Sequence, residues 1–350
     1  MCTIVHHRRK PSCPDVGVSV MPTPLLELRH IHKSFTVSGP QHLGKRVQLP
    51  AVCDVSLQLE RGKTLGLVGE SGCGKSTISK LIMGLLTPDK GTVHYQGTCL
   101  SQLSPRQWRP YRRQIQMIFQ DPYASLNPRM TVEQILSEPF IIHTRLNATE
   151  RRKKVATLLD TVGLSSSFAR RYPHEFSGGQ RQRIGIARAL ALQPEIIIAD
   201  EPVSALDLSI QAQIINLLDE LQQEFALTYL FISHDLSVVE HLCDDIAVMY
   251  LGRLVESSEV DRFYQQPLHP YSEALLQALP VANPRRQRRS LPSGEIPSPL
   301  NPPTGCSFHP RCPYAIDICR QQSPPLQAHH EAGLAACHRC DELTLDGLTS

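Results

Sequence analysis

The sequence has no apolar run long enough to cross a membrane. Its longest runs, at residues 196–199 and 246–251, fall far short of the roughly 18 residues that a membrane-spanning helix requires. Residues 1–20 contain basic side chains but no continuous apolar stretch, so they are not typical of a secretory signal. We expect a disordered extension at residues 1–23, and Met21, directly before the first strand-like pattern, is a candidate initiator.

The sequence also lacks an excess of charge of either sign. Lys and Arg number 36 against 33 Asp and Glu, a net charge of +3, so the overall charge indicates no particular partner. Two local basic clusters occur, at residues 6–10 and 285–289, in proline-containing stretches without aromatic residues. Solvated linkers are the expected structure of both, and we predict no nucleic-acid partner.

A disulfide framework is not indicated either. The chain has 11 cysteines, an odd number, and no export signal, which favours the reducing cytoplasm. Six of them are dispersed, and their expected role is small apolar filler or part of an unstructured segment. The other five are concentrated in the last part of the chain: Cys306, Cys312, Cys319, Cys337 and Cys340.

What the sequence does contain is an alternation of strand-like and helix-like patterns. Its 350 residues exceed one average domain. Short apolar runs separated by amphipathic stretches predict an α/β domain with a largely parallel sheet. Residues 121–192 show helical patterns only, and the chain after Gln266 is rich in proline and loses its periodicity. The predicted strands are residues 25–35, 52–59, 64–68, 195–199, 228–233 and 245–250, and the predicted helices include 75–86, 149–162, 209–225, 236–242 and 271–278.

A phosphate-binding loop stands between the third predicted strand and the helix that follows it. Residues 69–77 read Gly-Glu-Ser-Gly-Cys-Gly-Lys-Ser-Thr and fit G-x-x-x-x-G-K-S/T in the context that this motif requires. The glycines let backbone N–H groups converge on phosphate oxygens at a helix N-terminus. In such loops the lysine reaches the β and γ phosphates and the hydroxyl coordinates Mg²⁺. The predicted ATP-binding residues here are Gly69, Ser71, Gly72, Gly74, Lys75, Ser76 and Thr77, with Ser76 also a Mg²⁺ ligand.

Two adjacent carboxylates follow another apolar strand. Asp200 and Glu201 come directly after Ile-Ile-Ile-Ala at 196–199, and ligands bind at the carboxyl ends of the strands in such sheets. Adjacent positions at a strand end point in different directions. Asp200 can therefore hold Mg²⁺ while Glu201 faces a water molecule and acts as the general base. Together with the phosphate-binding loop, this pair predicts an NTPase.

A third motif narrows the class of NTPase. Residues 176–183, Phe-Ser-Gly-Gly-Gln-Arg-Gln-Arg, resemble the signature sequence of ABC proteins. A serine N-cap and glycines at a helix start make an anion site. The resemblance implies that this site binds the ATP held by an opposing subunit, through Ser177, Gly178, Gly179 and Gln180.

Other motifs that resemble those of ABC proteins appear in the family's order. Gln120 resembles the Q-loop glutamine, which implies contacts to the nucleotide and Mg²⁺. Residues 204–207 resemble the D-loop, and His234 resembles the switch histidine, which implies a catalytic role. Phe35 stands where an aromatic ring stacks on adenine in this family, and a core phenylalanine is the alternative interpretation of this residue.

The resemblance covers residues 25–337 and extends beyond the ATP site. Residues 120–128, 172–179 and 268–271, and the cysteine-containing segment after Pro297, are similar to the ATPase subunits of bacterial dipeptide and oligopeptide permeases, most of all to the second of the two. This implies an α/β fold: an ABC-type P-loop NTPase core at 24–257, a helical subdomain inserted at about 121–192, and a loop-rich, cysteine-containing C-terminal extension at 258–350.

The function that this resemblance implies is ATP hydrolysis that drives uptake of dipeptides and oligopeptides. The implied partners are a second, different ABC ATPase forming a heterodimer, two integral permease subunits and an extracytoplasmic peptide-binding protein, with this chain at the cytoplasmic face of the membrane. A soluble ABC ATPase acting on nucleic acid or ribosomes is the alternative. Such relatives generally carry two cassettes or long coiled coils, which this sequence lacks. Murein peptides, nickel and haem stay open as transported molecules.

The C-terminal cysteines predict a metal centre. A four-cysteine shell suits both a 4Fe–4S cluster and structural Zn²⁺, and a segment with so few large apolar residues needs such a staple to fold. The spacing does not decide between the two metals, and free cysteines are the third alternative. The C-x-x-C spacing of Cys337 and Cys340 makes Cys340 an alternate ligand. The resemblance favours the iron–sulfur cluster. The predicted ligands are Cys306, Cys312, Cys319 and Cys337.

Overall fold

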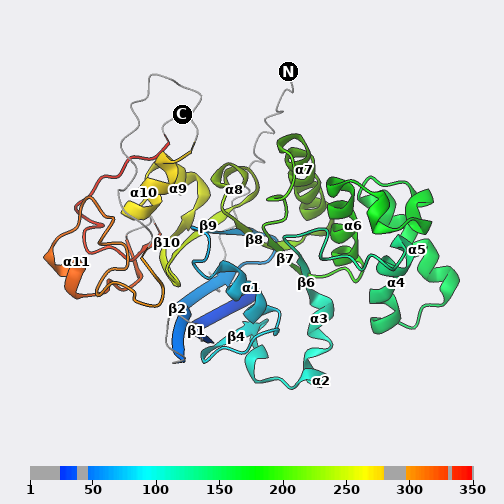
Figure 1. The fold of residues 1–350 in the computed structure, drawn as a ribbon, viewed down its shortest axis with the longest axis horizontal. Coiled ribbons are helices and arrows are strands. Elements are labelled where there is room, and N and C mark those ends of the chain that lie inside the picture. Colours follow the sequence, from blue (N-terminus) through cyan, green and yellow to red (C-terminus); the bar gives the residue numbers. More distant parts are fainter. Residues whose placement is uncertain (1–23, 38–45, 280–296, 330–332, 349–350) are drawn as a thin grey trace, which may run out of the picture.

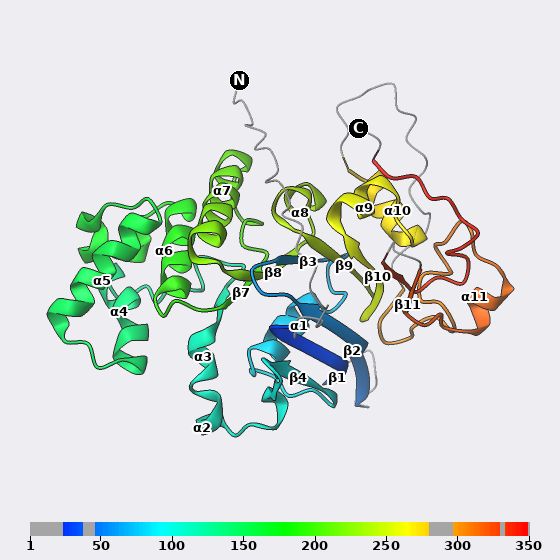
Figure 2. The same ribbon diagram turned by 180° about the vertical axis from the view of Figure 1, so that it is seen from behind.

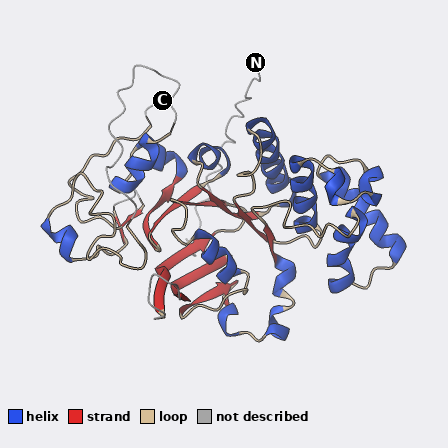
Figure 3. Cartoon of the chain, viewed as in Figure 1, coloured by secondary structure: helices blue, strands red, loops and turns tan. Residues whose placement is uncertain are grey.

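The structure is a computed structural model that describes residues 24–37, 46–279, 297–329 and 333–348. Two sheets lie at the centre, a group of helices lies at one side, and the C-terminal segment lies at the other (Figures 1 and 3). The predicted N-terminal extension, Met21 and both basic clusters fall outside the described residues.

The larger sheet carries the strands that precede the predicted ATP-site motifs. In spatial order it contains β11 (Gln327–Ala328), β12 (Leu334–Ala335), β10 (Arg253–Glu259), β9 (Asp245–Tyr250), β3 (Thr64–Val68), β8 (Thr228–Ser233), β7 (Ile196–Asp200) and β6 (Ile115–Ile118). From β9 to β6 the strands run parallel, and β3, β7 and β8 are buried along their whole length, as parallel strands covered on both faces are. The chain segments that follow β3, β6, β7 and β8 therefore all leave from one edge of the sheet.

A smaller antiparallel sheet lies beside it. Its strands are, in order, β2 (Val47–Leu59), β1 (Leu26–Val37), β4 (Lys90–Tyr95) and β5 (Thr98–Cys99). Leu26, Leu28 and Ile31 of β1 are buried. They share one core with Ile78 and Leu81 of α1 (Lys75–Ile82). The helix that follows the phosphate-binding loop is thus packed between the two sheets. The short helices η2 (Leu100–Gln102), α2 (Pro105–Trp108) and α3 (Tyr111–Gln114) connect to β6.

Between β6 and β7 the chain is helical, as predicted. This part contains α4 (Val132–His143), α5 (Ala148–Thr161), η3 (Ser166–Arg170), η4 (Pro173–Glu175) and α6 (Gly178–Leu190). A capping box starts each of the three α-helices: Thr131 with Gln134, Asn147 with Glu150, and Ser177 with Gln180. The helices form a lobe at the end of the sheet that carries β6, next to α7 (Leu208–Phe225), as Figure 2 shows from behind.

The C-terminal segment is attached to the larger sheet. After α8 (Leu236–Leu242), α9 (Val260–Gln265) and α10 (Pro270–Gln277) comes a loop-rich stretch with α11 (Asp317–Gln321). The strand β12 then pairs antiparallel with β10, with Glu256 opposite Ala335. Backbone pairing at Leu334–Ala335 therefore holds this segment against the α/β core.

The element predictions hold in most places. The strands β3, β8 and β9 and the helix α8 have the predicted bounds. Helix α1 ends at Ile82 instead of residue 86, because Gly84 adopts a left-handed conformation with φ 63° that ends the helix. Within the described ranges, no helix is both long and apolar enough to cross a membrane.

Candidate functional site

The phosphate-binding loop needs glycine where it passes β2. Gly74 is the N-cap of α1 with φ 111°, and a Cβ placed there would lie 2.3 Å from the carbonyl oxygen of Ala51. Only a residue without a Cβ fits such a close approach. The loop therefore leads directly into the N-terminus of α1, where free backbone N–H groups suit phosphate oxygens.

Lys75, the first residue of α1, is buried and held by carbonyl oxygens of the phosphate-binding loop. Only 5% of its surface is exposed. Its Nζ donates to the carbonyl oxygens of Gly69 at 2.7 Å and of Glu70 at 3.0 Å, and it lies 3.7 Å from the Sγ of Cys73. Within the described residues it makes no salt bridge. A buried ammonium requires compensating negative charge. The Asp200 carboxylate is close enough to interact with Lys75, and the position of this lysine at the start of α1 fits the phosphates of ATP.

Ser76 and Asp200 meet at the strand edge. The Ser76 hydroxyl donates to Oδ1 of Asp200 at 3.2 Å. Burial raises the pKa of the Asp200 carboxyl, the Ser76 hydrogen bond opposes this shift, and the nearby Glu201 charge adds to it. A hydroxyl and a buried carboxylate beside the phosphate-binding loop are ligands that Mg²⁺ prefers, so the two residues fit the predicted metal-binding role.

Glu201 contacts side chains of two other loops. Its backbone is left-handed, with φ 46°, a strained conformation for a non-glycine residue that is common at functional sites. The Gln120 side-chain amide donates to Oε2 of Glu201 at 2.8 Å, and Nδ1 of His234 lies 3.4 Å from the same oxygen. Gln120 and His234, from the segments after β6 and β8, thus converge on one carboxylate oxygen of Glu201, which follows β7.

The signature segment forms the predicted capped helix start. The Ser177 hydroxyl accepts from the backbone N–H of Gln180 at 3.3 Å, and the Gln180 side chain accepts from the backbone N–H of Ser177 at 3.1 Å. Gly179 is buried against Ile210 of α7, where a Cβ would lie 2.5 Å from Cγ2. The helix start is therefore rigidly packed. Its predicted contact with a nucleotide of another subunit stays a prediction.

The remaining predicted nucleotide contacts lie on the surface or near it. Ser71 and Gly72 are exposed at the tip of the phosphate-binding loop, and Gly178 is half-buried at the start of α6. Phe35 is half-buried on β1, with Nζ of Lys33 6.0 Å from its ring centroid. An accessible ring is compatible with stacking on adenine, and this role also stays a prediction.

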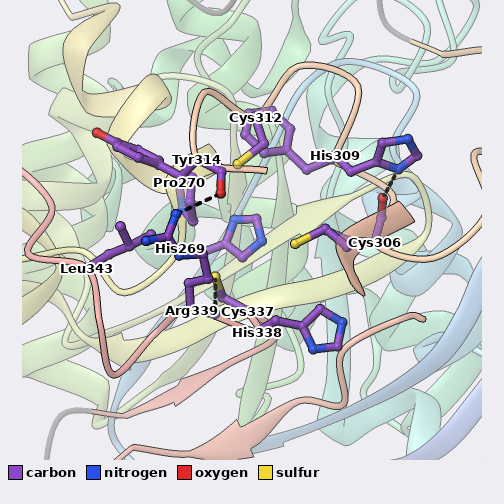
Figure 4. Close-up of a pocket in the computed structure, with 12 residues that line it drawn as sticks. His269, Pro270, Cys306, His309, Cys312, Tyr314, Cys337, His338, Arg339 and Leu343 are labelled. Atoms are coloured by element: carbon purple, nitrogen blue, oxygen red, sulfur yellow. Dashed lines mark hydrogen bonds between the residues drawn. The ribbon is translucent and has the colours of Figure 1, made fainter. Parts of the chain in front are cut away.

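The four cysteines predicted as metal ligands line one pocket. It contains Cys306, Cys312, Cys319 and Cys337 together with the buried His269. The sulfur atoms of Cys306, Cys312 and Cys337 project into the same space (Figure 4). The predicted alternate ligand, Cys340, is not among the lining residues. Cysteines up to 31 residues apart in the chain are therefore gathered by the fold.

The pocket is not closed around a metal ion. In the part of the chain that the structure describes, no three His, Cys, Asp or Glu side chains are placed so that they could hold one, and the cysteines are free thiols. Burial raises the pKa of Cys312 to about 12 and that of Cys337 to about 11. The donor chemistry of four cysteines fits a metal centre, whereas the arrangement of the side chains does not yet close around one.

Comparison with known proteins decides the family. Residues 52–204 match the ABC transporter family model, and residues 255–319 match that of the oligopeptide/dipeptide transporter C-terminal region. The oligopeptide transport ATP-binding protein AppF of Bacillus subtilis is 54% identical over 318 residues, which cover 90% of this chain and 97% of that protein. The chain belongs to the ATP-binding proteins of ABC transporters. Its resemblance to the peptide-permease branch, predicted from the sequence, is confirmed.

Other comparisons agree with this assignment. The dipeptide transport ATP-binding protein DppF of Escherichia coli is 50% identical over 321 residues, 91% of this chain and 95% of that protein. The ATP-binding cassette MJ0796, solved as a dimer in a post-hydrolysis state with ADP and Pi, superposes with a TM-score of 0.60 and 30% identity, covering 67% of this chain and 98% of that one. The predicted ABC ATPase fold is thereby confirmed, and this ABC protein is an ATPase.

One feature near the ATP site was not predicted from the sequence. Arg311 of the C-terminal segment forms a salt bridge with Glu70 of the phosphate-binding loop, and the Tyr271 hydroxyl accepts from the Glu70 backbone N–H. Arg311 and Tyr271 belong to no ABC motif. Their separation along the chain leaves no local sequence signal for the contact.

Proposed function

We propose that this chain hydrolyses ATP at the site formed after β3, β6, β7 and β8 and so drives uptake of dipeptides or oligopeptides through a membrane permease. The observation that supports hydrolysis most is the Glu201 carboxylate, which Gln120 and His234 hold beside the Ser76–Asp200 pair. The peptide class is supported by relatives named for oligopeptide and dipeptide transport.

In this proposal each side chain has one task. Lys75 and the loop N–H groups bind the phosphates, and Ser76, Asp200 and Gln120 hold Mg²⁺. Glu201 takes the proton of the attacking water, and His234 orients the Glu201 carboxylate. Bound ATP supplies the phosphoryl group, and Mg²⁺ neutralises its charge.

The proposed working unit is a closed sandwich of two cassettes. The anion site at Ser177 to Gln180 would complete the ATP site of a related but different ATPase subunit, and that subunit would complete the site of this chain. The surface beside the Q-loop, formed by residues 119–125, is connected to the signature helix α6. The Arg181 guanidinium lies 4.1 Å from the Tyr123 ring centroid, and Arg188 donates to the Ser125 carbonyl at 2.6 Å. Closure at the signature helix would therefore move this surface.

We infer that the same surface contacts the permease. Phe119 is 42% exposed and Tyr123 is 59% exposed, and exposed aromatic side chains are typical of binding surfaces. The proposed assembly contains two integral permease subunits and receives peptide from an extracytoplasmic binding protein. The chain would lie at the cytoplasmic face of the membrane, with an ATPase domain at 24–257, including a helical subdomain at about 121–192, and a C-terminal extension at 258–350.

For the cysteine pocket we propose a 4Fe–4S cluster, with Zn²⁺ as the alternative. The four lining cysteines would be its ligands, and the side chains would have to close around it. Its role would be structural, since the pocket lies in a segment with little core of its own.

Reconstitution in proteoliposomes tests the proposed function. Proteoliposomes would contain the chain, its partner ATPase and the permease subunits, with ATP supplied on the cytoplasmic side. With the binding protein present, uptake of labelled dipeptide, pentapeptide, nickel and haem would be measured. We expect ATP-dependent uptake of a peptide. Uptake of nickel or haem without any peptide would contradict the proposed substrate class.

A further inference from the structure

A salt bridge connects the C-terminal segment to the phosphate-binding loop. Arg311 donates through Nη1 to Oε2 and through Nη2 to Oε1 of Glu70, both at 3.0 Å. The Arg311 side chain is 12% exposed and the Glu70 side chain 24%, so water screens the pair only partly. The parallel two-bond form is the strong and geometrically specific form of an arginine–carboxylate contact.

Aromatic rings fix the orientation of the Arg311 guanidinium. It lies 5.9 Å from the ring centroid of Tyr250 and 5.8 Å from that of Phe308, and Nη1 is 3.4 Å from the Tyr250 hydroxyl. The same rings pack with Tyr271, at centroid distances of 4.6 Å from Tyr250 and 5.4 Å from Phe308. Few other orientations of the guanidinium are available between packed rings.

Glu70 in turn contacts the lysine of the loop. Its backbone N–H donates to the Tyr271 hydroxyl at 2.9 Å, and its carbonyl oxygen accepts from Nζ of Lys75 at 3.0 Å. The side chain and the N–H of Glu70 are therefore held by residues that follow the ATP-site motifs in the chain. The carbonyl of the same residue orients the ammonium predicted to bind phosphate.

We propose that Arg311 is a positioning residue of the ATP site, which, acting through Glu70 together with Tyr271, holds the phosphate-binding loop in its nucleotide-binding geometry. The C-terminal segment thereby contributes to ATP affinity. This inference rests on the proposed role of the loop in ATP binding. Arg311 directly precedes Cys312 of the cysteine pocket, so a structural change in that pocket has a short route to the loop.

Nucleotide titration of the full-length chain tests the inference. Affinity for a fluorescent ATP analogue would be measured with Mg²⁺ present, together with KM and kcat in the assembled transporter. We expect Arg311→Gln and Glu70→Gln each to weaken binding about tenfold, equivalent to about 1.4 kcal/mol. KM should rise more than kcat falls, because the loop binds ATP while the proposed base is untouched. Arg311→Lys, which keeps the charge, should recover part of the affinity.

Two comparisons separate positioning from general destabilisation. The double variant Glu70→Gln/Arg311→Gln should bind no more weakly than either single variant, because both remove one contact. The control, Arg320→Gln, changes an exposed arginine of the same segment and should bind as the unchanged protein does. If Arg311→Gln does not fold, Tyr271→Phe and Glu70→Gln provide the same test.

The contradicting outcomes are distinct. If Lys75→Ala abolishes binding while Arg311→Gln and Glu70→Gln bind normally, or if the two single effects add, Arg311 does not position the loop. If Lys75→Ala also binds ATP normally, the loop is not the ATP site, and this inference falls with that proposal.

Discussion

Replacing Gly74 by alanine tests the geometry of the phosphate-binding loop. The left-handed conformation at φ 111° costs an L-residue about 1–2 kcal/mol. The new Cβ would also lie 2.3 Å from the Ala51 carbonyl oxygen and 2.8 Å from Cε of Met249, and relieving such overpacking costs about 1–3 kcal/mol. We therefore expect Gly74→Ala to lower the free energy of unfolding by about 2–5 kcal/mol and to abolish ATP binding.

Two other glycines provide the comparison. Gly72 of the same loop has φ 81°, Gly97 in the turn between β4 and β5 has φ 78°, and a Cβ at either position meets no atom within 4 Å. Alanine at either position should therefore lower the free energy of unfolding only by the cost of the left-handed backbone conformation, about 1–2 kcal/mol. Gly72→Ala should nevertheless weaken ATP binding, because the new Cβ enters the space that faces the phosphates. Gly97→Ala should leave ATP binding unchanged.

Urea unfolding and calorimetric titration with Mg²⁺-ATP measure the two effects separately. Equal stabilities of Gly74→Ala and Gly97→Ala would refute the argument from close approach. Equal ATP affinities of Gly72→Ala and Gly97→Ala would show that the loop backbone does not face the phosphates.

Three further predictions concern other parts of the chain. Ser177→Arg should stop hydrolysis at the ATP site built on the partner's phosphate-binding loop and spare the ATP site of this chain, as measured with partner variants that lack one loop lysine. Loss of hydrolysis at this chain's own site only would contradict the sandwich. Ser165→Arg, at another serine N-cap, is the control. Anaerobically purified protein should be brown, with matched iron and sulfide, and Cys312→Ser should bleach it, whereas colourless protein containing zinc alone would refute the cluster but keep the site. Burial raises the pKa of Glu256 from its ordinary 4.5 to about 7. Because the pKa in the folded state is higher than in the unfolded state, the free energy of unfolding should fall by about 3 kcal/mol as pH rises from 4.5 to 7. Glu256→Gln should remove that dependence in urea unfolding, and an unchanged dependence would show that another group titrates.

The sequence predicted the ATP site best where the motif consists of residues adjacent in the chain. The phosphate-binding loop, the Asp200–Glu201 pair and the signature serine each have a local pattern that specifies the adjacent strand or helix start, and the structure has those elements. The convergence of Gln120 and His234 on Glu201 could be expected only from the family resemblance. It depends on the order of parallel strands, which no single segment encodes.

The C-terminal segment was predicted less completely. Its low periodicity correctly indicated a loop-rich structure, but β12 was not predicted, because a two-residue strand leaves no alternation to detect. The Arg311–Glu70 salt bridge joins residues 241 positions apart. Neither partner is unusual in its local sequence, so only the fold reveals the contact.

The most direct test of the central claim is the rate of ATP hydrolysis by Glu201→Gln in the assembled transporter. Removing a general base typically costs about 10²- to 10⁴-fold in rate, while the residues proposed to bind phosphate are unchanged, so we predict loss of turnover with ATP still bound. Glu195→Gln, directly before the same strand, is the matched control and should hydrolyse ATP normally. Near-normal hydrolysis by Glu201→Gln would contradict the account.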